Sequence, residues 1–222
     1  MSVESSATIA PLAIAVTGHR PNRLHIGIAE TERRIAWVIG ALRTGARGRR
    51  RIAVSALAEG ADRMFATAAL AHGFALHALL PFPSAHYETT FGDAATTDGY
   101  RELLARAASI TELPGSLADS KAAYEAVGRA TVDAADILVA VWDGRPAAGR
   151  GGTPEIIEYA IRRGTPVIWI DAARSRVPRL IAAPTAQGQR DIALDKLAAR
   201  AKSVTRRQLA ALAGSTIRRG SR

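Results

Sequence analysis

Short apolar runs alternate with amphipathic segments along most of this 222-residue chain, and this alternation constrains the fold more than any other feature. In most of these runs, polar residues do not alternate with the apolar ones, which predicts strands that are buried on both faces. The predicted strands are 12–16, 52–57, 75–82, 109–113, 137–142 and 166–170. The predicted helices between them are 29–43, 61–73, 100–108, 120–136 and 153–164. This order predicts an α/β fold, an open parallel sheet with helices on both faces, in which 166–170 is the last strand.

The pattern and the charge both change after Asp171. The segment 191–214 predicts one amphipathic helix or two short ones. Residues 181–222 carry seven of the ten net positive charges, so the body of the chain is only mildly basic. We therefore predict a ligand-binding domain over 1–173, followed by a basic linker and helical tail over 174–222.

Several classes of protein are excluded by what the sequence lacks. It has no cysteine, so disulfides, thiolate metal sites and cysteine nucleophiles are ruled out, and the absence fits a cytoplasmic location. The five histidines do not have zinc-ligand spacing, and we expect no metal. No apolar run approaches the ~20 residues of a membrane span. There is no G-x-x-x-x-G-K-[ST], no standard dinucleotide fingerprint and no G-x-S-x-G elbow.

Three loops that follow predicted strands are rich in small and polar residues. They read "VTGHRP", "SALAEGADR" and "WDGRPAAGRGGTPE". Because parallel strands point the same way, we expect all three loops at the carboxyl edge of the sheet, where ligands bind in such folds.

These loops carry the groups that a phosphate-bearing ligand requires. Glycines let backbone N–H groups come close, helix N-termini attract anions, and arginines and threonines add charge and hydroxyls. Each residue also has a plainer interpretation, because Gly60 could serve packing, His19 could be a satisfied loop histidine and Arg63 a solvated helix residue. We favour a ligand site because all three loops are expected at the same edge of the sheet. The candidate nucleotide- and phosphate-binding residues are Thr17, Gly18, His19, Arg20, Ser55, Glu59, Gly60, Asp62, Arg63, Gly144, Gly151, Gly152 and Thr153.

The segments "VTGHR", "SALAEGADRMFATAAL", "LLPFP" and "ADILVAVWDGRPAAGRGGTPEIIEYAIRRGTPVI" together resemble the SLOG superfamily over about residues 12–171. This group includes the DNA-processing protein Smf/DprA, the LOG cytokinin-activating hydrolases, and the YspA-like and YpsA-like proteins. The resemblance implies a Rossmann-like sheet that binds a nucleotide or a nucleotide-derived ligand at its carboxyl edge. It implies no other cofactor.

Three functions follow from the residues and the resemblance. The first is nucleotide binding, as a sensor or accessory protein. The second is hydrolysis or transfer at an N-glycosidic bond, in the manner of LOG phosphoribohydrolases or deoxyribosyltransferases, with Glu155 and Asp143 as catalytic candidates. The LOG pattern places its glutamate three residues after the threonine, whereas Glu155 is two residues after Thr153.

The third function is nucleic-acid binding, or contact with an acidic protein, through 181–222. That segment has no aromatic residue, which excludes base stacking there. Homo-oligomerisation is a further expectation, and we expect no membrane association.

Overall fold

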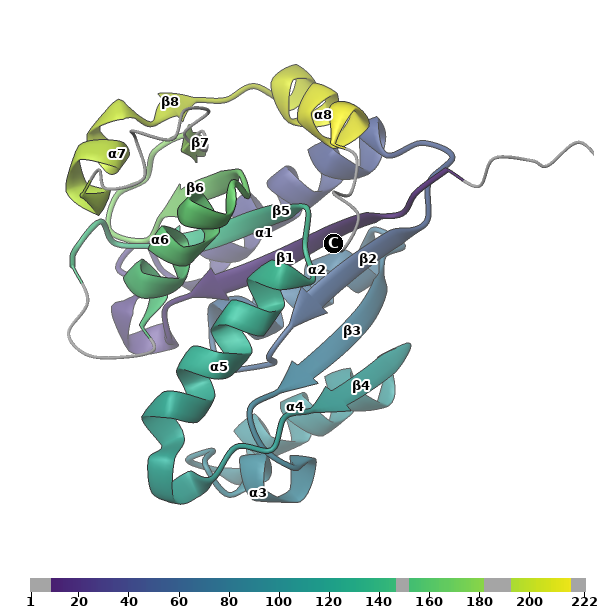
Figure 1. Ribbon diagram of the computed structural model, residues 1–222, viewed down its shortest axis with the longest axis vertical. Coiled ribbons are helices and arrows are strands. Elements are labelled where there is room, and N and C mark those ends of the chain that lie inside the picture. The colour runs from purple at the N-terminus through teal and green to yellow at the C-terminus, as the bar shows by residue number, and fades with distance from the viewer. Residues whose placement is uncertain (1–8, 147–151, 182–192, 217–222) are drawn as a thin grey trace, which may run out of the picture.

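The computed structural model describes residues 9–146, 152–181 and 193–216. Within these ranges the chain forms one eight-stranded sheet in the order β4-β3-β2-β1-β5-β6-β7-β8 (Figure 1). Strands β1 to β6 are parallel, whereas β7 and β8 are antiparallel to their neighbours. The predicted Rossmann-like α/β fold is confirmed, with a mixed rather than fully parallel sheet. The strand bounds are β1 Leu12–Gly18, β2 Arg51–Ser55, β3 Ala75–Leu80, β4 Ser109–Glu112, β5 Ile137–Trp142, β6 Val167–Asp171, β7 Arg179–Ile181 and β8 Lys202–Ser203.

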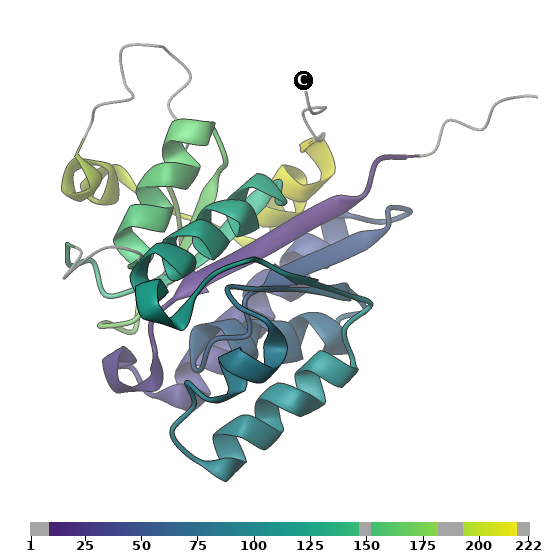
Figure 2. The same ribbon diagram turned by 60° about the horizontal axis from the view of Figure 1, so that its bottom comes forward.

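Helices cover both faces of the sheet, because alternate residues of the central strands point to opposite sides. In β1, Leu12, Ile14 and Val16 pack toward one face and Ala15 packs toward the other. The first face is covered by α1 (Ile28–Gly45), α2 (Ala61–Ala71), α4 (Ala94–Ala105) and α8 (Arg206–Ser215). The second is covered by α5 (Ser120–Asp133), α6 (Thr153–Arg163) and α7 (Leu194–Arg200). Figure 2 shows α5 and α6 on one side of β1, and α1 and α2 on the other. Short elements complete the fold: η1 (Pro21–Arg23), α3 (Ser84–Glu88) and η2 (Leu117–Asp119).

The sequence prediction was wrong about where the sheet ends. Strand β6 is not the last, because the chain returns as β7 and pairs Ile181 with Val167. These added strands have three and two residues, too few to form a recognisable apolar run. The helix expected at 100–108 starts earlier, at Ala94, where the Asp93 side chain accepts a hydrogen bond from Thr96 N–H.

The basic C-terminal segment contains two short helices, α7 and α8, on either side of β8. Helix α8 packs against α1 so closely that a Cβ on Gly45 would lie 1.8 Å from the Ala210 carbonyl oxygen. The division at residue 173 remains a prediction, although residues beyond it contribute strands to the sheet. None of the described helices is long and apolar enough to cross a lipid bilayer.

The topology places the predicted loops together. Strand β1 pairs with β2 on one side and with β5 on the other, so the strand order changes direction beside β1. The loops after these three strands therefore leave the same edge at a topological switch point, which is where open α/β sheets bind ligands.

Candidate functional site

A cavity of about 210 Å³ lies at this switch point, and we call it the switch-point cavity. It is bounded by the ends of β1 and β2, the first turns of α2 and α6, and one face of α5. Its apolar wall includes Tyr87, Tyr124 and Ile156. Its polar wall is formed by Thr17, Arg20, Glu59, Asp62, Thr131 and Thr153. Five of these six are predicted ligand-binding residues, and the fold brings them together from three separate loops.

Asp62 is the buried carboxylic acid of the switch-point cavity. It lies in the first turn of α2 and is 7% exposed. Burial raises the pKa of its carboxyl to about 7, although a hydrogen bond from the backbone of Ala58 and the charge of Arg63 act in the opposite direction. Asp62 can therefore exchange a proton near neutral pH, which is the property expected of an acid or base at a functional site.

Thr131 contributes a polar group that the sequence analysis did not identify. Its hydroxyl oxygen is buried in the wall and has no hydrogen-bond partner among the described residues. Tyr124, Val127 and Gly128 of the same helix also line the cavity. These positions follow the i, i+3, i+4, i+7 spacing of one helix face. This spacing could have shown from the sequence that Thr131 shares a face with the other three residues, but not that this face lines the cavity.

The loop between β2 and α2 is strained, and buried polar groups hold it in place. Leu57 has a φ of +56°, which is unusual for a residue with a side chain. The Ser55 hydroxyl accepts a hydrogen bond from Leu57 N–H and donates one to the Asp62 carbonyl. Arg63 Nε donates to the Leu57 carbonyl at 2.9 Å, and its guanidinium packs 4.4 Å from the Phe91 ring centroid. Burial lowers the pKa of Arg63. Ser55 and Arg63 thus brace the wall rather than line the cavity.

Two predicted glycines have protein neighbours where a side chain would lie. A Cβ on Gly60, whose φ is +95°, would lie 2.6 Å from the His19 carbonyl oxygen. A Cβ on Gly18 would lie 2.4 Å from the Ala61 Cβ. The small residues between β2 and α2 are therefore explained by tight packing of the loop after β1 against the loop after β2.

His19 and Asp143 connect the loops after β1 and β5. The His19 Nε2 atom lies 3.0 Å from Asp143 Oδ1, and its Nδ1 lies 3.5 Å from the Thr153 hydroxyl. Arg23 donates to Asp143 Oδ2 at 2.7 Å. Burial lowers the pKa of His19 and acts to raise that of Asp143. Hydrogen bonds from Arg23 and His19 outweigh that effect and bring the pKa of Asp143 down to about 2. Asp143 is thus ionised, and both of its carboxylate oxygens already have partners that hold the loops after β1 and β5 together.

Helix α6 directs its N-terminus toward the switch-point cavity. Gly152 is the N-cap and supplies no capping side chain, so the helix dipole is available to an anion. Thr153 and Ile156 line the cavity, whereas Glu155 belongs to the first turn without being part of the lining. Gly151 lies outside the described residues. Gly144 lines a second cavity, together with Asp143.

The arrangement of strands and helices defines a Rossmann-like α/β protein, and one comparison with a solved structure supports that class. No protein-family model and no curated protein matches the sequence. The chain is similar in structure to DNA processing protein A (DprA) from Streptococcus pneumoniae, with a TM-score of 0.53 and 18% identity. That similarity covers 90% of this chain and 60% of the other, so this chain matches only part of the DprA structure. A molybdenum cofactor binding protein from Rippkaea orientalis has a TM-score of 0.39 and 16% identity, over 72% of this chain and 76% of its own. The likeness to DprA supports the fold.

Proposed function

We propose that this is a SLOG-related protein that binds a nucleotide or nucleotide-derived ligand in the switch-point cavity. The observation that carries the proposal is the meeting of three strand-end loops, the N-terminus of α6 and one polar cavity at the switch point. In this arrangement the phosphate lies at the N-terminus of α6 and near Arg20. The hydroxyls of the sugar meet Glu59, Asp62 and the hydroxyl of Thr131, which has no hydrogen-bond partner in the described parts of the chain.

Calorimetry and thermal unfolding with a panel of nucleotides test this proposal. A ligand at about 100 times its Kd should add about 2.7 kcal/mol of stability. We expect Thr131→Val to weaken binding about 5- to 10-fold, because the sugar loses a buried hydrogen-bonding partner. Thr67→Val is the matched control, because Thr67 is exposed on α2. Equal affinities of the two variants, or no binding by the wild type, would contradict the proposal.

Hydrolysis of an N-glycosidic bond is the second candidate, and Asp62 is the observation in its favour. Asp62 and Glu59 line the same cavity, and the pKa of about 7 leaves Asp62 partly protonated at neutral pH. In this reaction the bond between C1′ and the base nitrogen breaks as Asp62 gives its proton to the base. Water then adds its hydroxyl to C1′, and the proton that water releases returns to the Asp62 carboxylate. Asp62 replaces Asp143 as the catalytic candidate, because Asp143 is held by Arg23 and His19.

Release of free base from nucleoside monophosphates, followed by chromatography, decides between binder and enzyme. If the protein is a hydrolase, Asp62→Asn abolishes release and leaves ligand affinity within a few-fold of the wild type. If it is only a binder, the wild type releases no base.

Nucleic-acid binding is a third candidate, supported by exposed cations of the C-terminal segment. Lys196, Arg200, Lys202, Arg206 and Arg207 are all exposed. Contacts between such cations and phosphates are independent of sequence and weaken steeply with salt. Fluorescence anisotropy with a labelled oligonucleotide at several salt concentrations tests this candidate. A flat salt dependence would rule it out.

A further inference from the structure

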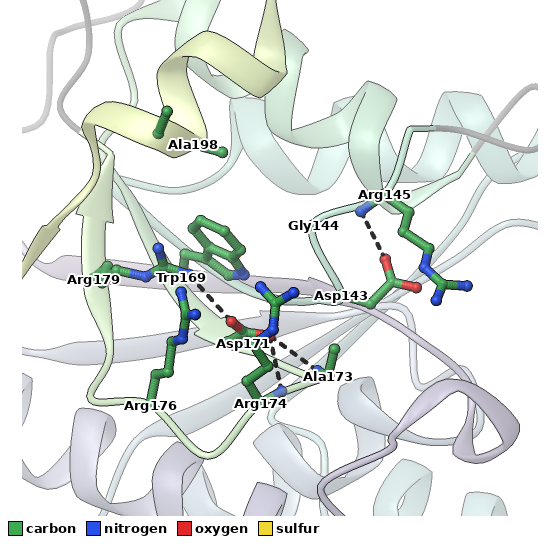
Figure 3. Close-up of a pocket in the computed structure, with 11 residues that line it drawn as sticks. Asp143, Gly144, Arg145, Trp169, Asp171, Ala173, Arg174, Arg176, Arg179 and Ala198 are labelled. Carbon is green, nitrogen blue, oxygen red and sulfur yellow. Dashed lines mark hydrogen bonds and ion pairs between the residues drawn. The ribbon is translucent and has the colours of Figure 1, made fainter.

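A second cavity, of about 340 Å³, lies at the same edge of the sheet, beyond the turn at Asp143. It is bounded by the ends of β5 and β6, the loop from β6 to β7, and α7 (Figure 3). We call it the arginine pocket. Its charged and aromatic lining consists of Arg145, Arg174, Arg176, Arg179, Asp143, Asp171 and Trp169.

The floor of the arginine pocket is fixed by buried contacts. Trp169 donates from its indole nitrogen to the Trp142 carbonyl at 2.9 Å, and the two rings lie 5.0 Å apart. The guanidinium of Arg179 stacks 3.6 Å from the centroid of Trp169 and donates to Asp171 Oδ2 at 3.3 Å. One cation of the pocket is therefore held in place before any ligand arrives.

The carboxylates of the arginine pocket pair with one of its arginines, Arg179, and leave the other three without an acidic partner among the described residues. Asp171 Oδ1 accepts hydrogen bonds from the backbone N–H groups of Ala173 and Arg174, and its Oδ2 is used by Arg179. Asp143 is used by Arg23 and His19. Among the described residues no acidic side chain forms an ion pair with Arg145, Arg174 or Arg176.

Figure 3 shows the side chains of Arg174, Arg176 and Arg179 together in the pocket beside Trp169, and the guanidinium of Arg179 stacks on the Trp169 ring. Burial lowers the pKa of Arg179, and the charges of Arg176 and Arg174 lower it further while Asp171 acts against them. The three cations therefore repel one another, and an anion between them would relieve that repulsion.

We propose that the arginine pocket binds the diphosphate group of a small molecule. Planar guanidinium groups match phosphate oxygens in pairs, and three of them provide more donors than one monophosphate uses. The cavity volume lies within the range of small-molecule sites, roughly 300–1,000 Å³. The site is separate from the switch-point cavity and does not depend on the function proposed there.

Isothermal titration calorimetry of the full chain with sodium pyrophosphate, at constant ionic strength, tests the proposal. We expect saturable binding of one pyrophosphate at this pocket. The double variant Arg174→Ala/Arg176→Ala should weaken that binding about 10-fold or more, because charge-assisted hydrogen bonds are lost. Both side chains are exposed, so the variant should fold, which circular dichroism checks.

The matched control is Arg43→Ala/Arg47→Ala, which removes the same charge from exposed positions in the last turn of α1 and just after it, neither of which lines the pocket. It should keep the wild-type affinity for pyrophosphate. Equal weakening in both double variants, or no saturable binding by the wild type, overturns the proposal. The same holds if Thr131→Val weakens pyrophosphate binding as much as the arginine variant does. Binding of a single-stranded oligonucleotide that depends on Arg174 and Arg176, without binding of pyrophosphate, would assign the pocket to a polymer and also overturn it.

Discussion

The switch-point cavity and the arginine pocket share one edge of the sheet, but their polar groups are placed differently. In the first, Asp62 and Thr131 are buried, and Ser55 and Arg63 form the supporting hydrogen bonds within the wall. In the second, Arg174 and Arg176 are exposed on one loop above a rigid floor. The difference separates buried polar groups, which the surrounding protein encloses, from exposed cations that have no acidic partner among the described residues. Substitutions in the wall of the first cavity should lower stability, and those around the second should lower anion affinity.

Gly60→Val should have the largest effect on stability. The side chain would be forced into a φ of +95° and into the backbone of His19 and Arg20. Strain and overpacking together should cost about 4 kcal/mol of unfolding free energy. Urea denaturation measures this loss. Gly48→Val is the control, because Gly48 has a φ of +76° with nothing within 4 Å, so it should show only the cost of strain, about 1–2 kcal/mol. Equal losses would mean that the close packing of the two loops contributes nothing.

Arg63→Met should lower the unfolding free energy by about 2–3 kcal/mol, because the carbonyls of Leu57, which is buried, and Thr96, which is half-buried, lose a charged donor. Methionine keeps the length of the side chain and its packing on Phe91. The control is Arg101→Met, which breaks an exposed ion pair with Glu88 and should cost much less stability than Arg63→Met. If both variants lose the same stability, Arg63 does not brace the strained loop.

Asp62 should make stability depend on pH. Its pKa in the folded state, about 7, lies above the ordinary value of 3.8, so between these values the folded state holds a proton that the unfolded state has lost. The unfolding free energy should therefore fall as pH rises from 4 to 7, by at most about 1.4 kcal/mol per pH unit. Urea denaturation across this window should show that Asp62→Asn removes this component. An unchanged slope would mean that the carboxyl of Asp62 is solvated.

Asp143 is the opposite case in the same experiment. Its pKa of about 2 lies below 3.8, so its contribution to stability is present above pH 4 and is lost as pH falls from 4 to 2. Arg23→Ala should reduce that loss, because Arg23 donates the shortest hydrogen bond to Asp143. The pH dependence thus distinguishes Asp62, which can take up a proton near neutral pH, from Asp143, which holds two loops together. The same acid sensitivity in the wild type and the variant would contradict this role of Arg23.

The sequence predicted the sheet well where long apolar runs mark its strands. Strand β5 has the predicted bounds because six consecutive apolar residues have no other stable place than the sheet interior. The sequence also grouped Thr17, Asp62 and Thr153 correctly, because the carboxyl ends of parallel strands share one edge.

The sequence could not distinguish residues that line the cavity from residues that support its wall. Ser55 and Arg63 are of the types that commonly contact ligands, and only the structure shows that they donate hydrogen bonds to backbone carbonyls. The arginine pocket was missed for a related reason. It forms because β7 returns antiparallel to β6 and brings Arg179 over Trp169, and a three-residue strand leaves no periodic signal.

Removing the exposed arginines of the arginine pocket should have the smallest effect on the stability of the protein. Arg174→Ala/Arg176→Ala should change the unfolding free energy by about 0.5 kcal/mol or less, because the two side chains are exposed and have no acidic partner among the described residues. The sign should be stabilising at low salt, because the variant removes cations that repel Arg179. Added salt screens this repulsion, with a screening length of about 10 Å at 0.1 M. Salt should therefore stabilise the wild type more than the variant in urea denaturation. A loss of stability above about 1 kcal/mol would place these arginines in the same structural class as Arg63. Little change in stability, together with a large loss of pyrophosphate affinity, is the result expected if these arginines bind a ligand and do not stabilise the fold.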